Sequence, residues 1–122
     1  MRVLVADDDA ANRYIMSRFL ARLGVEAAFA ADGRAALAAL EGEGGIGLAF
    51  LDLSMPGLEG TAVARALRAR EAAEGRPRAV LIALTGADDG TEAMRAGFDD
   101  FLQKPVSYAV IEGAIARWGR KA

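Results

Sequence analysis

Short apolar runs alternate with segments of helical periodicity along this 122-residue chain, and this alternation constrains the fold more than any other feature. The apolar runs lie at residues 2–6, 25–30, 48–51, 80–84 and 101–102. Helical patterns follow them, near residues 15–23, 35–40, 61–73, 91–95 and 108–118. Parallel strands need crossover connections, which are right-handed in nearly all proteins. The sequence therefore predicts an α/β fold: a doubly wound, five-stranded parallel sheet with helices on both faces.

The length of the chain fits one domain, so we expect residues 1–122 to fold together. Asp9 and Asp32 stand where helix N-caps are expected, and Gly24 and Gly42 where helices end. One face of the first helix carries Ile15, Met16, Phe19, Leu20 and Leu23, of which Met16, Phe19 and Leu20 should belong to the core. The last helix should bury a stripe made by Ile111, Ile115 and Trp118.

The composition excludes several classes of function. The sequence has no histidine, which excludes Ser-His hydrolases, histidine metal sites and a phosphohistidine within this chain. It has no cysteine, which excludes thiolate zinc sites and fits the cytoplasm, where we expect the protein. A net charge of −2 offers no basic footprint for nucleic acid. No apolar run approaches the roughly 20 residues of a membrane span, and the N-terminus lacks a signal-peptide pattern.

Polar residues stand at the ends of the predicted strands. Asp7, Asp8 and Asp9 follow the first strand, and Asp52, Thr85 and Lys104 follow the third, fourth and fifth strands. Ligands of open parallel sheets bind beyond the carboxyl ends of the strands. Clustered carboxylates repel one another unless a cation or a cationic side chain lies among them. The sequence therefore predicts one shared pocket at this edge of the sheet, in which Asp9 serves only as a helix cap.

The residues of this pocket suit a hard divalent cation. Carboxylates without histidine or cysteine form an oxygen-only site, and Mg²⁺ binds through few carboxylates together with water and phosphate. We expect Asp8 to hold the metal directly and Asp7 to support it through water. Asp52 and the backbone carbonyl of Ser54 would add further oxygen ligands.

The same pocket could support phosphoryl transfer. A carboxylate beside Mg²⁺ can attack phosphorus and form an aspartyl phosphate. Asp52 is the best candidate nucleophile, because it stands alone at a strand end before the turn at residues 55–57. Lys104 and Thr85 would stabilise charge on the phosphoryl group.

These motifs resemble those of response-regulator receiver domains of two-component signalling, and the resemblance extends over the whole chain. The matching segments are 3–9 (VLVADDD), 51–57 (LDLSMPG), 83–86 (ALTG) and 101–105 (FLQKP). Further segments resemble the receivers of hybrid sensor histidine kinases: Asn12-Arg13, Arg68 with Glu71, and residues 97–105 (GFDDFLQKP). The chain could therefore be an excised part of such a kinase or a stand-alone regulator.

The resemblance implies a (βα)5 flavodoxin-like fold with strand order 2-1-3-4-5, and Mg²⁺-dependent phosphorylation of Asp52 from a partner's phosphohistidine. It also implies a cis peptide bond before Pro105 and a switch in which Thr85 moves inward and Phe101 follows. The partner would be a histidine kinase or a histidine phosphotransfer protein, which in related receivers often meets the first helix. The surface formed by residues 91–95, 101–102 and 108–118 would change partner affinity, and the chain would be a monomer or a weak dimer.

Two alternatives stay open at this point. A phosphatase resembling haloacid dehalogenases would also use Mg²⁺ and an aspartyl phosphate, but its nucleophile would lie in the first strand's motif. There the sequence DDDAA at residues 7–11 lacks the expected threonine or valine, and the chain has no substrate-enclosing cap. The other alternative is a degenerate receiver that only binds other proteins. In the favoured interpretation the chain catalyses only its own aspartyl phosphorylation and slow dephosphorylation. Histidine kinase activity is expected only if the chain is a fragment of a hybrid kinase.

Overall fold

The structure, a computed structural model, describes residues 2–42, 44–86 and 90–119. Its strands are β1 (Arg2–Ala6), β2 (Glu26–Ala30), β3 (Ile46–Asp52), β4 (Val80–Thr85) and β5 (Asp100–Gln103). Its helices are α1 (Ala10–Arg22), α2 (Gly33–Glu41), α3 (Gly60–Glu74), α4 (Thr91–Ala96) and α5 (Tyr108–Trp118). Every predicted strand and helix is present. Among the strands, the largest shift is in β3, which begins at Ile46 rather than Leu48, because Ile46 pairs with Arg2 of β1.

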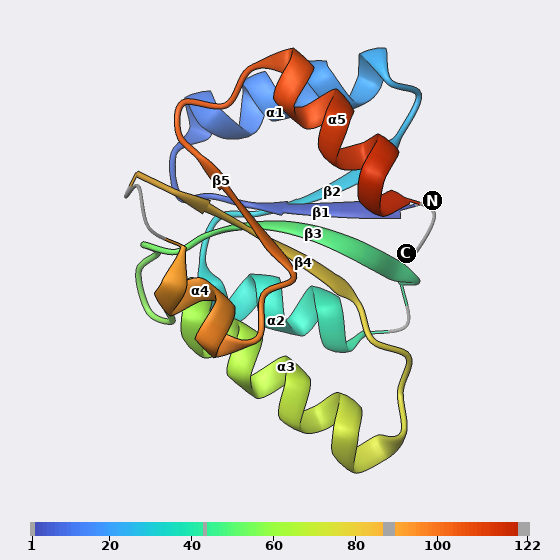
Figure 1. The fold of residues 1–122 in the computed structure, drawn as a ribbon, viewed down its shortest axis with the longest axis vertical. Coiled ribbons are helices and arrows are strands. Elements are labelled where there is room, and N and C mark those ends of the chain that lie inside the picture. The colour runs from blue at the N-terminus through green and yellow to red at the C-terminus, as the bar shows by residue number, and fades with distance from the viewer. Residues whose placement is uncertain (1, 43, 87–89, 120–122) are drawn as a thin grey trace.

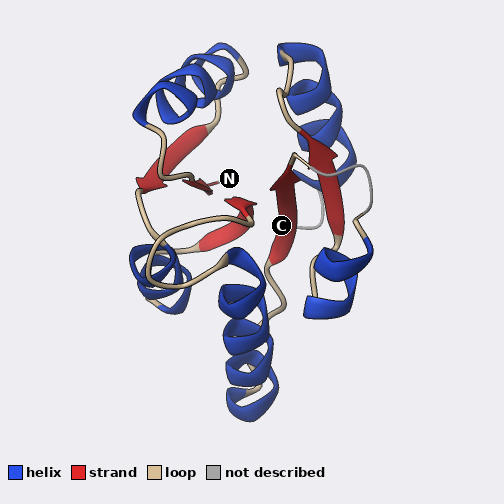
Figure 2. Cartoon of the chain, turned by 90° about the vertical axis from the view of Figure 1, so that its left-hand side faces the viewer, coloured by secondary structure: helices blue, strands red, loops and turns tan. Residues whose placement is uncertain are grey.

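The strands form one parallel sheet in the order β2-β1-β3-β4-β5, which confirms the predicted fold class. Helices α1 and α5 cover one face of the sheet, and α2, α3 and α4 cover the other (Figure 1). The view turned by 90° in Figure 2 shows the strands between these two layers of helices. The order reverses direction between β1 and β3, which is where a doubly wound sheet opens a crevice for ligands.

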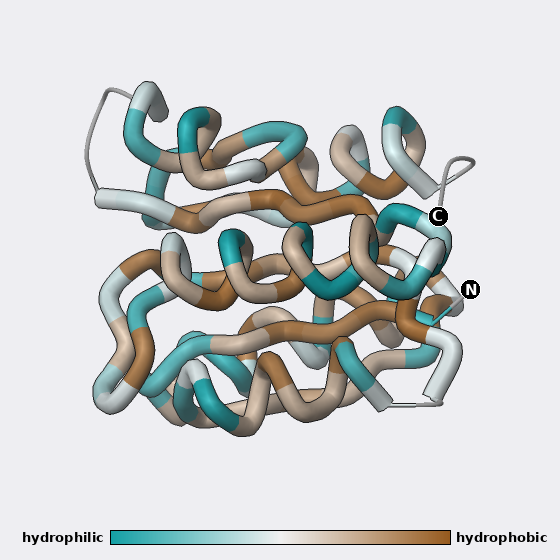
Figure 3. The backbone as a smooth tube through the Cα atoms, turned by 90° about the horizontal axis from the view of Figure 1, so that it is seen from below, coloured by the Kyte–Doolittle hydropathy of each residue, from teal (hydrophilic) through white to brown (hydrophobic). Residues whose placement is uncertain are grey.

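The core lies on both faces of the sheet. Leu4 and Ala6 of β1 belong to the buried cluster beneath α2, α3 and α4, whereas Val3 and Val5 belong to the cluster beneath α1 and α5. Strands that are covered on both sides need apolar residues at every position, and this explains the unbroken apolar runs in the sequence. In Figure 3 these runs appear as brown stretches along the extended segments.

Helix ends follow the sequence signals. The carboxylate of Asp9 accepts a hydrogen bond from the amide of Ala11 at 2.8 Å, and that of Asp32 accepts one from Ala35 at 2.8 Å. Both aspartates are therefore the predicted N-caps. Gly24, just beyond α1, has a φ of 71°, a left-handed conformation that glycine adopts without steric cost.

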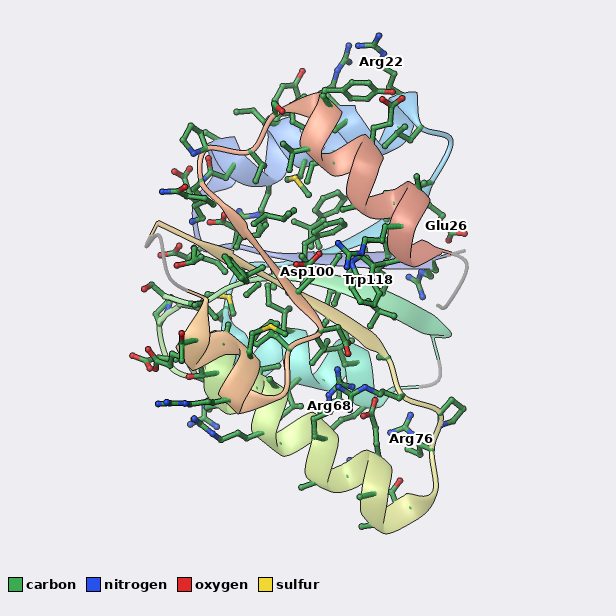
Figure 4. The ribbon with its side chains drawn as sticks, in the orientation of Figure 1. Arg22, Glu26, Arg68, Arg76, Asp100 and Trp118 are labelled. Carbon is green, nitrogen blue, oxygen red and sulfur yellow. The ribbon has the colours of Figure 1, made fainter. Side chains whose placement is uncertain are left out.

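The last helix packs on the sheet largely as predicted. Ile111 is fully buried, and Ile115 and Trp118 are partly buried against the same cluster. The indole nitrogen of Trp118 donates a hydrogen bond to Asp100 Oδ2 at 2.9 Å, which joins α5 to β5 (Figure 4). Among the described helices, none is long and apolar enough to cross a bilayer.

The first helix buries only part of its apolar face. Met16 and Leu20 are buried and Phe19 is partly buried against the same cluster, as expected for core residues. Ile15 of the same apolar face is 44% exposed and lies outside the core. Ile15 and the 64% exposed Tyr14 both expose large side chains in the N-terminal half of α1.

Candidate functional site

Strand pairing brings the predicted site residues to one edge of the sheet. Asp7 follows β1, and its amide donates to the carbonyl of Ala30 at the end of β2. Asp52 is the last residue of β3, and Thr85 is the last residue of β4. The amide of Lys104, just after β5, donates to the carbonyl of Thr85 at 2.7 Å. All four residues thus lie at the carboxyl ends of parallel strands, as the sequence predicted.

Three carboxylates converge at this edge. One oxygen from each of Asp7, Asp8 and Asp52 lies within 4.8 Å of the other two. Asp7 and Asp52 are 2% and 5% exposed, whereas Asp8 is exposed to solvent. Lys104 Nζ lies 2.8 Å from Asp52 Oδ2 and 3.6 Å from Asp7 Oδ2. One ammonium group does not balance three carboxylates, so the cluster keeps an excess of negative charge.

The cluster fits a magnesium ion. All three groups offer hard oxygen ligands, two of them are buried, and their excess charge favours a divalent cation. Ser54, whose backbone carbonyl is a predicted metal ligand, is held beside Asp52. Its amide donates a hydrogen bond to Asp52 Oδ1 at 3.1 Å. Asp7, Asp8 and Asp52 would hold the ion.

Lys104 is held in its charged form by its neighbours. Burial alone would lower the pKa of Lys104, but the hydrogen bond to Asp52 and the charges of Asp52 and Asp7 outweigh burial, and the pKa is raised. The ammonium group is therefore cationic throughout the physiological range and available to a phosphoryl group at this edge.

This raised pKa predicts how stability depends on alkaline pH in the absence of metal. Since the pKa is higher in the folded state, the stabilisation by Lys104 is complete below its unfolded pKa of about 10.4 and is lost as the pH rises through the folded value. The free energy of unfolding should fall more between pH 8.5 and 11 in the wild type than in Lys104→Met, by up to about 1 kcal/mol. Urea titrations in the presence of a chelator measure it. An equal or smaller fall in the wild type would contradict the account, because both proteins share every other titrating group.

The residues expected to switch occupy neighbouring strands. Thr85 is buried at 6% exposure, and Phe101 of β5 pairs with Ala83 of β4. The ring of Phe101 lies against the backbone of Gly90, since a Cβ atom added there would come within 2.1 Å of the ring. The structure therefore places Phe101 beside the start of α4.

Two features of the site were not predicted from the sequence. A cleft of about 320 Å³ opens beside Asp7 and Lys104, and its apolar lining includes Ile15, Pro105 and Val106. Arg13 of α1 turns back on the loop after β1, and its Nη1 donates to the carbonyl of Asp7 at 2.7 Å. A helix-face pattern cannot reveal either feature, because both depend on how α1 sits on the sheet.

Comparison with known proteins agrees with this geometry. The family model of the response regulator receiver domain matches residues 3–116. Hybrid signal transduction histidine kinase L of Dictyostelium discoideum is 36% identical over 124 residues, which cover 98% of this chain but only 7% of that kinase.

Two solved structures have a similar fold. The structure of the Saccharomyces cerevisiae receiver domain of Ssk1, solved with the histidine phosphotransfer protein Ypd1, has a TM-score of 0.92 and 28% identity, covering 98% of this chain and 89% of that one. The receiver domain of the Pseudomonas aeruginosa sensor histidine kinase PA1611, with magnesium in its active-site cleft, has a TM-score of 0.83 and 29% identity, covering 96% and 95%.

Proposed function

The chain belongs to the response regulator receiver domain family, and we propose that its Asp52 accepts a phosphoryl group from the phosphohistidine of a partner protein. One observation carries this assignment of the acceptor. Asp52 is the carboxylate that directly hydrogen-bonds Lys104, at 2.8 Å, within the cluster of three. The acceptor, its counter-charge and the metal-binding oxygens thus share one small site. We further propose that residues 1–122 form one phosphoacceptor domain.

The residues present suit each part of the transfer. A carboxylate oxygen of Asp52 forms a bond to phosphorus while the phosphorus–nitrogen bond of the donor breaks, and the imidazole nitrogen keeps the electron pair. Lys104 lies beside Asp52 and can neutralise charge on the phosphoryl oxygens, and the hydroxyl of Thr85 can donate a hydrogen bond to them. Mg²⁺, when bound, would supply positive charge close to the phosphoryl oxygens.

The surface beside the site suits a protein donor. Tyr14 and Ile15 expose large side chains in the N-terminal half of α1, and the cleft lined by Ile15 and Val106 lies next to Lys104. We propose that a histidine phosphotransfer protein or the dimerisation domain of a histidine kinase docks here. The Ssk1 receiver, solved together with Ypd1, gives this proposal a precedent among its structural neighbours.

The phosphatase alternative is not favoured. Such an enzyme would use a nucleophile after the first strand, but the carboxylate of Asp7 accepts from the amide of Asp9 and lies 3.6 Å from Lys104, farther than Asp52 does. A degenerate receiver is not favoured either, because the acidic residues, Thr85 and Lys104 are all present at the site. The only reactions that the chain would catalyse are its own phosphorylation and slow dephosphorylation.

Phosphoryl transfer to the intact chain tests this function. The chain is mixed with a histidine phosphotransfer protein that carries labelled phosphohistidine, either with Mg²⁺ or with a chelator. Label should move to the chain with Mg²⁺ only and should be released by hydroxylamine, as an acyl phosphate is. Label that stays on every donor tried, or that moves equally well in the chelator, would reject the proposal.

We also propose that Thr85 and Phe101 transmit phosphorylation to the surface of α4, β5 and α5. Only contacts that differ between two conformations can shift their populations. The contact between Phe101 and Gly90 is such a candidate, because an aromatic ring lies against a residue without a side chain.

Gly90→Ala should therefore destabilise the protein by about 1–3 kcal/mol, the usual cost of overpacking, and should shift the NMR resonances of the Phe101 ring. The added methyl group would come within 2.1 Å of the ring, although the backbone at Gly90, with φ of −85°, accepts alanine. Gly86→Ala is the matched control, since nothing lies within 4 Å of its added Cβ atom. Urea unfolding and ring resonances that are the same for both variants would show that Phe101 does not rest on Gly90.

A further inference from the structure

Arg13 lies in the first turn of α1, but its guanidinium group points back to the loop between β1 and α1. Its Nη1 donates to the backbone carbonyl of Asp7 at 2.7 Å, and the residue is half-buried. We propose that Arg13 is a positioning residue of the metal site, which holds the peptide between Asp7 and Asp8 so that the Asp8 carboxylate stays close to Asp7 and Asp52. The inference rests on the proposed function, since it concerns the same metal site.

The Asp8 carboxylate depends on its backbone for its position. Within the described residues, no hydrogen bond or ion pair holds this carboxylate, and Asp8 is exposed. Yet one of its oxygens lies within 4.8 Å of oxygens of Asp7 and Asp52. Like charges at this separation repel, so in the absence of metal an untethered Asp8 would move into solvent.

The Arg13 contact restrains the peptide unit between Asp7 and Asp8. A peptide unit is planar, and the carbonyl of Asp7 shares its plane with the nitrogen and Cα atoms of Asp8. Fixing this carbonyl oxygen therefore restrains the position of the Asp8 Cα atom, from which the Asp8 side chain leaves the backbone. The other hydrogen bonds of this loop hold different peptide units. The Asp7 amide donates to the carbonyl of Ala30, and the Asp9 amide donates to Asp7 Oδ1 at 2.9 Å.

The positioning role of Arg13 and its positive charge predict opposite effects on Mg²⁺ affinity. As a cation near three carboxylates, Arg13 repels Mg²⁺, and its removal would tighten binding if charge alone mattered. As a restraint on Asp8, it keeps a ligand in place, and its removal weakens binding. Residues that orient metal ligands typically affect metal affinity by about 10–100-fold, whereas an exposed charge is screened by salt. The positioning effect should therefore dominate.

The experiment compares Mg²⁺ dissociation constants of the intact chain by calorimetry at physiological salt. Arg13→Ala should raise the dissociation constant by roughly tenfold. Arg13→Lys, which keeps the charge and one possible donor to the Asp7 carbonyl, should restore most of the affinity. Arg18→Ala is the matched control, because Arg18 is an exposed arginine of the same helix, and it should bind Mg²⁺ as the wild type does.

A second readout is independent of metal. Amide hydrogen exchange at Asp9, whose amide donates to Asp7 Oδ1, should be faster in metal-free Arg13→Ala than in the wild type, and circular dichroism would verify that the variant is folded. Should Arg13→Ala not fold, Arg13→Lys and Arg13→Met form the comparison, and only the methionine variant should bind weakly.

Unchanged or tighter Mg²⁺ binding by the neutral variant would overturn the role of Arg13, and so would unchanged exchange at the Asp9 amide. Either result would leave the proposed function intact, provided that the wild type binds Mg²⁺ and takes up label. A wild type that does not bind Mg²⁺ would instead overturn both proposals.

Discussion

Replacing Arg68 with methionine should lower the free energy of unfolding by about 3–5 kcal/mol, the range typical for removing one partner of a buried ion pair. Arg68 extends from α3 and donates to the carbonyls of Gly97 and Ala79, at 2.9 and 2.7 Å. It also donates to the carboxylates of Glu71 and Asp99, at 2.8 and 2.9 Å. The three charged side chains are only 9–16% exposed. Figure 4 shows Arg68 between α3 and the sheet.

The cost arises mainly from the groups left behind. Glu71 Oε2 would still accept from the amide of Ala79, but Glu71 would lose the cation beside it. Asp99 would keep Arg78, which donates to its Oδ1 at 2.9 Å. Removal of Arg68 therefore affects Glu71 more than Asp99, because Glu71 keeps no cationic partner among the residues that the structure describes. Adding Glu71→Gln to Arg68→Met should recover part of the stability, because an uncharged amide is cheaper to bury than an unpaired carboxylate.

Urea unfolding of the single and double variants measures these differences. Arg70→Met is the matched control on the same helix, since Arg70 forms exposed ion pairs with Glu41 and Glu74 and should matter far less. Mg²⁺ binding should not change, because the contacts of Arg68 lie away from Asp52. If Arg68→Met were as mild as Arg70→Met, the network would contribute no net stability.

The sequence was sufficient to predict the sheet and the meeting of the acidic residues with Lys104. Both follow from local rules: buried parallel strands need unbroken apolar runs, and their carboxyl ends share an edge. This is why Asp7, Asp52 and Lys104 could be grouped before any contact was known. The helix caps at Asp9 and Asp32 were predictable for the same reason, since a cap binds amides only two or three residues away.

Features that depend on tertiary packing were not predictable. Ile15 belongs to an apolar helical face, but periodicity does not tell which edge of that face the sheet covers. Arg68 binds Gly97 and Asp99, which lie 29 and 31 residues away, and no local pattern connects them. The β3 strand was predicted too short because Gly44, Gly45 and Gly47 around its start resemble a loop, whereas pairing with β1 extends it to Ile46.

Asp52→Asn should abolish phosphoryl transfer to the chain. An amide oxygen is a poor nucleophile, and the substitution also removes the charge that pairs with Lys104 and binds metal. The shape of the side chain and its acceptor for the Ser54 amide are kept, so the variant should fold. Asp9→Asn is the matched control, because Asp9 caps α1 and asparagine caps a helix equally well.

The most direct test of the account is therefore label uptake from a phosphorylated histidine phosphotransfer protein, measured with Mg²⁺ for the wild type, Asp52→Asn and Asp9→Asn. The account predicts uptake by the wild type and Asp9→Asn, and none by Asp52→Asn. Label on a folded Asp52→Asn chain would contradict the assignment of the acceptor.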